Sequence, residues 1–256
     1  MSLAWAVPLG LLIGVVLGSL GGGGAILTVP LLVYAFQQPP AAATTGSLII
    51  VGLSSLLGLV AHPVRGNVHY AEGFIFGLCA VPGAAIGSLA SARLSGTMLM
   101  LLFAGLLVVV AVTLLRRARL DSRLETPAAP ARPWPVQLGA ALAVGALTGF
   151  FGVGGGFAVV PALVLVLGFT IRSAAATSLL VVAINSAAAL TIRVAIDPMP
   201  VDWALIGTLG TCGAIGAVAG TRLASRLDQA QLSTAFAGLL VAVAAFLIIQ
   251  NVSLHL

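Results

Sequence analysis

The sequence predicts an all-α polytopic membrane protein built from two internal repeats, and three observations lead to this class. The 256-residue chain is 60% hydrophobic, only 7% of its residues are charged, and its mean hydropathy is +1.19. Soluble domains carry about 25% charged residues, so this composition excludes them. Uncharged apolar stretches long enough to span a bilayer recur along the chain. Finally, a glycine-rich motif occurs twice, with a constant offset of 131 residues.

The doubled motif lies inside the first apolar segment of each half. Its copies are GSLGGGGAILTVP at residues 18–30 and GFFGVGGGFAVVP at residues 149–161. Each copy is surrounded by about 33 uncharged residues, which as one straight helix would be roughly 50 Å long against a hydrocarbon core of about 30 Å. Glycine runs are where such a helix would break most easily. We therefore expect a glycine-broken or re-entrant segment in each half.

The remaining elements of the first half follow in order after that segment. The broken segment extends over residues 3–36, and the Gln-Gln-Pro-Pro sequence at residues 37–40 predicts a turn. Apolar stretches at residues 41–61, 70–92 and 97–115 predict three transmembrane helices, with a polar loop before the second. Residues 1–115 thus form the first transmembrane repeat.

Residues 116–135 contain five arginines and four prolines, which predicts a solvated cytoplasmic linker between the halves. The second repeat, residues 136–256, has its broken segment at 136–167 and three expected helices at 173–192, 201–220 and 231–250. Further motifs recur near the ends of the repeats: Phe-Ala-Gly-Leu-Leu occurs at residues 103–107 and again at 236–240. Duplication of this kind is a common basis of transporter folds.

The arginines indicate how the two halves face, because cytoplasmic loops carry an excess of positive charge. If both broken segments cross the membrane, the arginines divide into seven on one side and four on the other. If both segments turn back, the division is nine against two, with only Arg93 and Arg193 outside. The second division predicts inverted repeats, a cytoplasmic central loop and both termini on the outer face.

Several function classes are excluded or disfavoured by what the sequence lacks. It contains no phosphate-binding loop ending in Gly-Lys-Ser/Thr and no His, Cys, Asp or Glu cluster with metal-ligand spacing. We therefore expect neither an enzyme nor a bound metal or cofactor. Every basic residue is an arginine, and nearly half of the arginines lie in the central loop, which indicates membrane topology rather than nucleic-acid binding.

The glycines of the motif are the main candidates for a substrate site. Glycine permits positive φ and lets several backbone N–H groups point at one ligand, and a half-helix that begins there adds its positive dipole end. Such a site attracts small anions without a fixed charge. The alternative is close helix packing through small residues. The candidates are Gly21, Gly22, Gly23, Gly24, Gly152, Gly154, Gly155 and Gly156.

Polar side chains near the motif form a second group of candidates. Hydroxyl groups in apolar helices line a polar path in one interpretation and bond their own helix backbone in the other. Asn185 is the stronger case, because an amide in an apolar span is costly to leave unpaired. The substrate-binding candidates are Thr28, Thr45, Ser47, Thr177, Ser178 and Asn185. Arg93 and Arg222 occupy matching positions at helix ends, where they either anchor the membrane interface or form an anion vestibule.

These motifs together resemble the TauE/SafE sulfite exporter family, also called the 4-toluene sulfonate uptake permease family. The resemblance covers roughly residues 10–250. It rests on the Gly-x-Gly-Gly-Gly…Pro core in both halves, the Ala-x-Ala-Thr-Ser segment after it, the Gly-x-x-x-Gly-x-Arg-Leu helix end and the basic central loop. One departure is Thr44-Thr45-Gly46-Ser47, whereas the second half keeps Ala176-Thr177-Ser178. This departure puts strict equivalence of the two half-sites in doubt.

The resemblance implies a secondary transporter of the bacterial-type inner membrane, with sulfite, sulfonates or related small sulfur-containing anions as its substrates. The residues themselves favour an anion carrier in which the glycine-rich breaks bind the anion and the halves rock to give alternating access. The alternatives are a carrier of another small solute and a non-transporting membrane scaffold or assembly protein. The bilayer is the expected environment. A homodimer is compatible with the sequence, although no residue argues for it.

Overall fold

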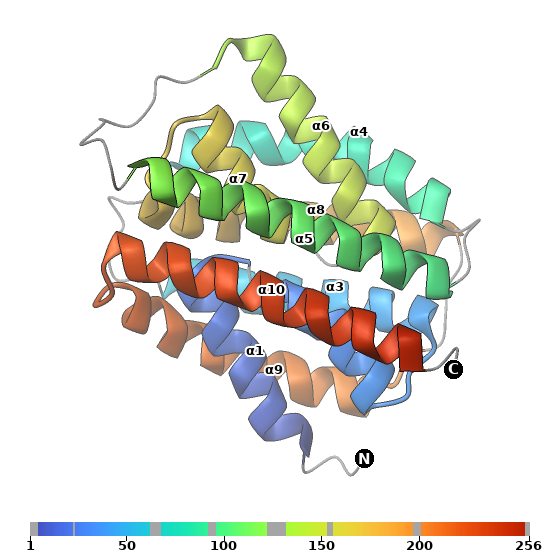
Figure 1. Cartoon of the computed structure of the whole chain (residues 1–256). Helices are drawn as coiled ribbons and strands as arrows, with labels where there is room; N and C mark the ends of the chain where they lie inside the picture. The colour runs from blue at the N-terminus through green and yellow to red at the C-terminus, as the bar shows by residue number, and fades with distance from the viewer. Residues whose placement is uncertain are drawn as a thin grey trace.

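A computed structural model of the chain describes residues 5–22, 24–61, 68–91, 96–121, 132–152, 156–196 and 201–253. These residues fold into helices without strands, which confirms the all-α class (Figure 1). The elements are α1 (Ala6–Leu20), α2 (Ala25–Pro30), the π-helical turn η2 (Leu31–Ala35), α3 (Pro40–Val60), α4 (Tyr70–Ser91), α5 (Gly96–Asp121), α6 (Trp134–Phe151), α7 (Gly156–Val166), α8 (Ile171–Ile196), α9 (Trp203–Ala224) and α10 (Gln229–Ser253).

Five of these helices, α3, α4, α6, α8 and α9, are long and apolar enough to cross a membrane. Large hydrophobic side chains also lie exposed on their outer surfaces, as at Val60, Ile86 and Ile215. Exposing so much apolar surface to water would be unfavourable, whereas the same surface is stable against lipid chains. The chain is a multi-pass membrane protein. The stretch expected as a linker, residues 116–135, is helical at both ends, where α5 continues to Asp121 and α6 begins at Trp134.

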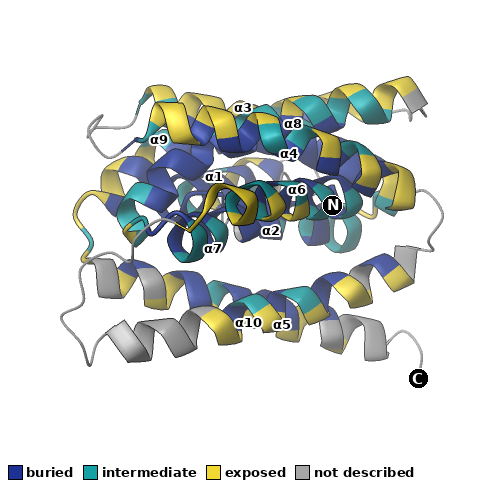
Figure 2. Ribbon diagram, turned by 90° about the horizontal axis from the view of Figure 1, so that it is seen from above, coloured by how far each residue is buried: buried dark blue, intermediate teal, exposed yellow. Residues whose placement is uncertain are grey.

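The helices form three layers, seen most clearly in Figure 2. The upper layer of that view contains α3, α4, α8 and α9, and the middle layer contains α1, α2, α6 and α7. Helices α5 and α10 lie side by side as the third layer and contact one another along their length. The glycine-containing segments are therefore enclosed between two layers of long helices.

The most extensive helix contacts pair α1 with α9 and α4 with α6, so each pair joins one helix from each half of the sequence. Glycines make both contacts close: a methyl group on Gly14 would overlap the backbone carbonyl of Gly213, and one on Gly145 would overlap that of Ala80. Gly14 and Gly145 are 131 residues apart, as are the two glycine motifs. Small residues allow this backbone approach, which drives helix association in a membrane.

In both halves, the segment that contains the glycine motif returns toward its starting point. The backbone N–H of Arg132, just before α6, donates to the carbonyl of Val166 at the end of α7, at 2.8 Å. In the first half, a methyl group on Gly24 would overlap the carbonyl oxygen of Ile13 in α1, so the chain after the break lies against the helix before it. The helices α1–α2 and α6–α7 therefore form two helical hairpins.

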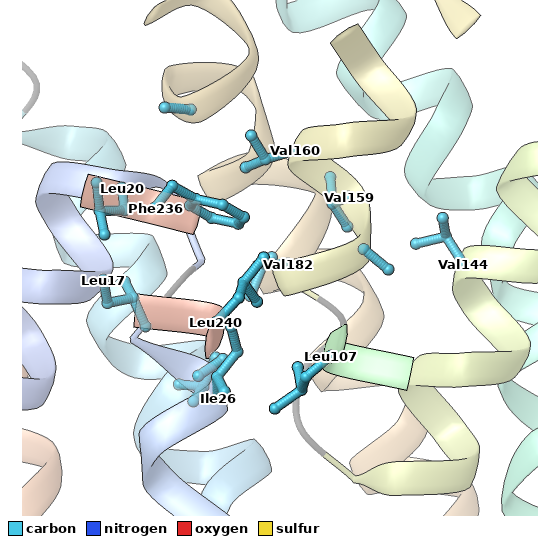
Figure 3. Packing of buried hydrophobic residues seen from close by; sticks show 14 of the residues in the cluster. Leu17, Leu20, Ile26, Leu107, Val144, Val159, Val160, Val182, Phe236 and Leu240 are labelled. Atoms are coloured by element: carbon cyan, nitrogen blue, oxygen red, sulfur yellow. The ribbon is translucent and has the colours of Figure 1, made fainter. Parts of the chain in front are cut away.

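Side chains from α5 and α10 cover these hairpins and complete the hydrophobic core. Phe103 and Leu107 of α5 are almost fully buried, and so are Phe236 and Leu240 at the matching positions of α10. Figure 3 shows Leu240 and Leu107 pointing into a cluster that includes Ile26 of α2. The repeated Phe-Ala-Gly-Leu-Leu motif thus supplies equivalent buried side chains from both halves.

Candidate functional site

The first glycine junction, residues 21–24, connects α1 to α2. Helix α1 ends where Gly21 takes the left-handed conformation with φ 58°, and Gly22 follows with φ 77°. Non-glycine residues rarely adopt these angles, so the chain can reverse here because the residues are glycines. The N–H of Gly22 donates to Leu17 at 3.2 Å, and that of Ala25 donates to Gly22 at 3.0 Å. The N–H groups of Gly21 and Gly22 both donate to Leu17 of α1, so two backbone donors of the junction are already used.

The second glycine junction, residues 152–155, connects α6 to α7 in a similar way. Gly152 follows the last helical residue with φ 64°, and its N–H donates to Thr148 at 2.9 Å. Helix α7 then begins at Gly156. Three of the candidate glycines, Gly23, Gly154 and Gly155, lie outside the described residues.

The two hairpins meet at Gly22 and Gly156. A methyl group on either glycine would overlap the Cα atom of the other. Because the α1–α2 hairpin comes from the first half and α7 from the second, residues 134 positions apart in the sequence become direct neighbours. The first junction and the start of α7, directly after the second junction, therefore lie at one place in the molecule.

Each junction also packs against a long helix of the opposite half. Gly21 lies against Ala175 and Ser178 near the start of α8, and Gly152 lies against Thr44 near the start of α3. The hydroxyl of Ser47, also on α3, donates to the carbonyl of Gly152. At the offset of 131, Ser47 corresponds to Ser178, so the two halves exchange equivalent contacts.

Most of the candidate hydroxyl groups near the junctions bond the backbone of their own helix. The hydroxyl of Thr28 donates to Gly24 at 3.2 Å, that of Thr45 to Ala41 at 3.1 Å, and that of Ser178 to Ala175 at 2.8 Å. Thr177 differs, since its hydroxyl oxygen accepts from the backbone N–H of His69 at 3.0 Å. These bonds satisfy the groups locally but leave oxygen lone pairs available.

A set of fully buried polar side chains on α3 and α8 makes no hydrogen bond within the described residues. These are Ser54, Ser55, Asn185 and Ser186. Asn185 is the most informative, because both atoms of its amide lack a partner while the residue has no exposed surface. A buried amide left unpaired destabilises a protein by about 1–3 kcal/mol. Such groups are where a ligand or an ordered water would bind.

Sequence reasoning missed Arg193, which lies in the last turn of α8. Its guanidinium donates to the hydroxyl of Thr44 and, at 3.2 Å, to that of Ser91 at the end of α4. The structure thus brings a cation beside the residue that packs on Gly152. Of the two predicted vestibule residues, Arg222 is exposed near the end of α9, and Arg93 lies outside the described residues.

Further polar features lie at and near α4. A cavity of about 70 Å³ between α4 and α6 is lined by Glu72, Cys79 and Trp134 among others. The carboxylate of Glu72 is 3.9 Å from the imidazole of His69, which stacks on Phe169. No three His, Cys, Asp or Glu side chains in the described part of the chain gather where they could bind a metal.

Comparison with known proteins decides the family. The model of the family "Sulfite exporter TauE/SafE" matches residues 6–247, which is nearly the whole chain. The chain belongs to this family. It is 34% identical to a "Probable membrane transporter protein" of Xylella fastidiosa (strain Temecula1) over 250 residues, covering 96% of this chain and 95% of the relative. The TauE/SafE resemblance predicted from the sequence is therefore confirmed.

Two proteins of Bacillus subtilis (strain 168) are also similar to this TauE/SafE chain. The "Probable membrane transporter protein YunE" is 30% identical over 210 residues, covering 73% of this chain and 76% of the relative. The "Probable membrane transporter protein YdhB" is 28% identical over 237 residues, covering 90% and 96%. No solved structure matches the chain. These matches support membrane transport as the general function.

Proposed function

We propose that this TauE/SafE protein is a secondary transporter of small sulfur-containing anions such as sulfite, sulfonates or related oxyanions. The anion is bound where the two glycine junctions meet, by backbone N–H groups that have no acceptor within a helix, such as those of the first turn of α7 from Gly156 onward. The halves then rock against one another, so that this site opens to each side of the membrane in turn.

The observation that carries the proposal is the contact between Gly22 and Gly156, with each junction held by a helix of the opposite half. A site at this place is shared by both halves, so any relative movement of the halves alters it. Glycine at these positions keeps side chains away from the backbone N–H groups, and α7 adds the positive end of its dipole to the site. An anion needs both features.

The side chain of Asn185 supports the same proposal. Its amide has no partner among the described residues in a fully buried position, and a costly polar group inside a membrane segment points to a functional role. An oxyanion would accept from the amide nitrogen. Neutral donors suit this role in a membrane, because they bind an anion without the desolvation penalty of a second buried charge.

The two helical hairpins also support an inverted-repeat architecture. In this proposal, each hairpin enters the membrane and leaves on the same side, and three transmembrane helices follow it in each half. The hydrogen bond between Arg132 and Val166 supports the return of the second hairpin. The proposed orientation in a bacterial-type inner membrane keeps the central linker cytoplasmic and both termini on the outer face, as the arginine distribution favours.

The experiment that tests the proposal measures anion binding to the purified full-length protein as thermal stabilisation in detergent. The anions are sulfite, thiosulfate, sulfate, methanesulfonate and chloride. We expect a selective shift with a sulfur oxyanion, because a ligand that binds only the folded state raises the unfolding temperature. No shift with any of these anions, in protein that unfolds cooperatively, would contradict the proposal and favour another solute or a scaffold.

Two variants locate the binding. Asn185→Leu should lose most of the anion-dependent shift. Gly105→Ala is the matched control, since its added methyl group would touch nothing within 4 Å, and it should keep the full shift. Equal shifts in both variants would show that the anion binds elsewhere.

A further inference from the structure

The guanidinium of Arg193 joins three helix ends next to the second glycine junction. It donates to Thr44 near the start of α3 and to Ser91 at the end of α4, while Arg193 itself lies in the last turn of α8. Thr44 in turn packs directly against Gly152. One end of the proposed anion path therefore contains a fixed positive charge that is only one residue away from the junction.

Helix α8 connects this charge to the other junction. Ser178 lies against Gly21 near the start of the helix, and Arg193 follows fifteen residues later, about 22 Å farther along the axis. Asn185 is placed between them. At 100° per residue, Ser178, Asn185 and Arg193 fall within about 80° of one another around the helix. The polar residues of α8 thus form a stripe on one face that extends from the first junction to the second.

The two ends of this stripe are chemically different. At the offset of 131, Thr44 corresponds to Ala175, which packs on Gly21 and has no hydroxyl group. At this matched position the second junction has a hydroxyl group that accepts from a guanidinium, whereas the first has an alanine. A guanidinium suits an oxyanion particularly well, because its planar fork donates two parallel hydrogen bonds to two oxygens.

We propose that Arg193 is an anion-binding subsite at one end of the transport path, which captures the oxyanion before it passes along α8 to Asn185 and the glycine junctions. This inference rests on the transport function proposed above. In the proposed orientation, this end faces the outer side of the membrane. Thr44 and Ser91 position the guanidinium, and the anion displaces one of these hydroxyl groups when it binds.

The test compares sulfite transport by the full-length protein in proteoliposomes, with sulfite supplied separately to each face. Arg193→Gln removes the charge and should raise the KM for sulfite about 10- to 100-fold from the face at the C-terminal end of α8, as expected for losing a hydrogen bond to a charged group. The maximal rate should change much less. Arg226→Gln removes an exposed arginine after α9 and is the control, with the KM of the wild type.

Two further variants keep the test decisive if Arg193→Gln does not fold. Arg193→Lys retains the charge but not the planar fork, and its KM should lie between those of the wild type and the glutamine variant. Thr44→Val removes the positioning hydroxyl and should raise the KM from the same face. Wild-type KM values from both faces in the folded Arg193 and Thr44 variants would overturn the subsite. If the wild type itself transports no sulfur anion, the proposed function fails instead.

Discussion

Gly22 and Gly156 lie so close together that a methyl group on either would overlap the Cα atom of the other. This contact joins the two halves of the chain at the point where both helical hairpins reverse. Because backbone meets backbone there, the contact has no side chain that could adapt to a substitution. The region should therefore be the least tolerant of added volume in the protein.

Replacement of Gly156 by alanine should lower stability. The added methyl group must push the two junctions apart, and overpacking of this kind destabilises proteins by about 1–3 kcal/mol. Gly207→Ala is the matched control: it adds the same group to the interior of α9 with nothing within 4 Å, and should be neutral or stabilising by up to about 1 kcal/mol. Thermal unfolding in detergent compares the two. Equal unfolding temperatures would contradict the tight contact.

Ser47 and Ser178 occupy matching positions but should respond differently to alanine. The Ser47 hydroxyl bonds the carbonyl of Gly152 in the opposite half as well as that of Thr44 in its own helix, whereas the Ser178 hydroxyl donates to Ala175 of its own helix. Ser47→Ala should therefore destabilise the protein by about 1 kcal/mol, the usual net contribution of such a bond. Ser178→Ala should have a smaller effect. If chemical denaturation gives the reverse order, the bond between the halves is not what stabilises the second junction.

Asn185→Leu should separate stability from function. Leucine has a similar size, and it removes a buried amide that has no partner, so the free energy of unfolding should rise by about 1 kcal/mol. Sulfite flux should nevertheless fall at least tenfold, because the amide contributes to anion binding. A more stable variant with unchanged flux would mean that Asn185 does not contact the substrate.

The inverted arrangement predicts that α6 and α9 begin on opposite sides of the membrane. In a background without Cys79 and Cys212, single cysteines at Val136 and Trp203 test this, since both positions are exposed at helix starts. An impermeant thiol reagent should label Trp203→Cys in intact cells and Val136→Cys only after permeabilisation. Labelling of both or neither in intact cells would contradict the proposed topology.

Much of the fold is readable from the sequence because the membrane restricts the choices. A chain with 7% charged residues must satisfy its backbone internally, so the all-helical class follows. The positions of the long helices also follow from apolar length: the helix expected at 173–192 is α8, residues 171–196. The observed helix ends differ by a few residues from the expected ones where a helix extends past its apolar stretch. Helix α5, for example, continues through Arg116 to Asp121.

The assembly of the site was less accessible to sequence reasoning. The glycine runs indicate where helices end, but not that Gly22 lies against Gly156, because no local pattern encodes a contact between residues 134 positions apart. Arg193 reads as an ordinary loop arginine, since its contact with Thr44 depends on how α3, α4 and α8 pack. The internal repeat was the available signal for this site. At the offset of 131 residues it pairs Thr44 with Ala175, so the two halves differ at this position. The substrate-binding roles of the candidate residues stay predictions.

Locating a bound oxyanion in the crystal would test whether it binds where the two glycine junctions meet. Selenite has the charge and shape of sulfite and contains an anomalous scatterer, so its position can be found in crystals of the wild-type protein. We expect an anomalous peak within hydrogen-bonding distance of the backbone around Gly22 and Gly156 or of the Asn185 amide. A peak confined to another place, such as the cavity between α4 and α6, would contradict it.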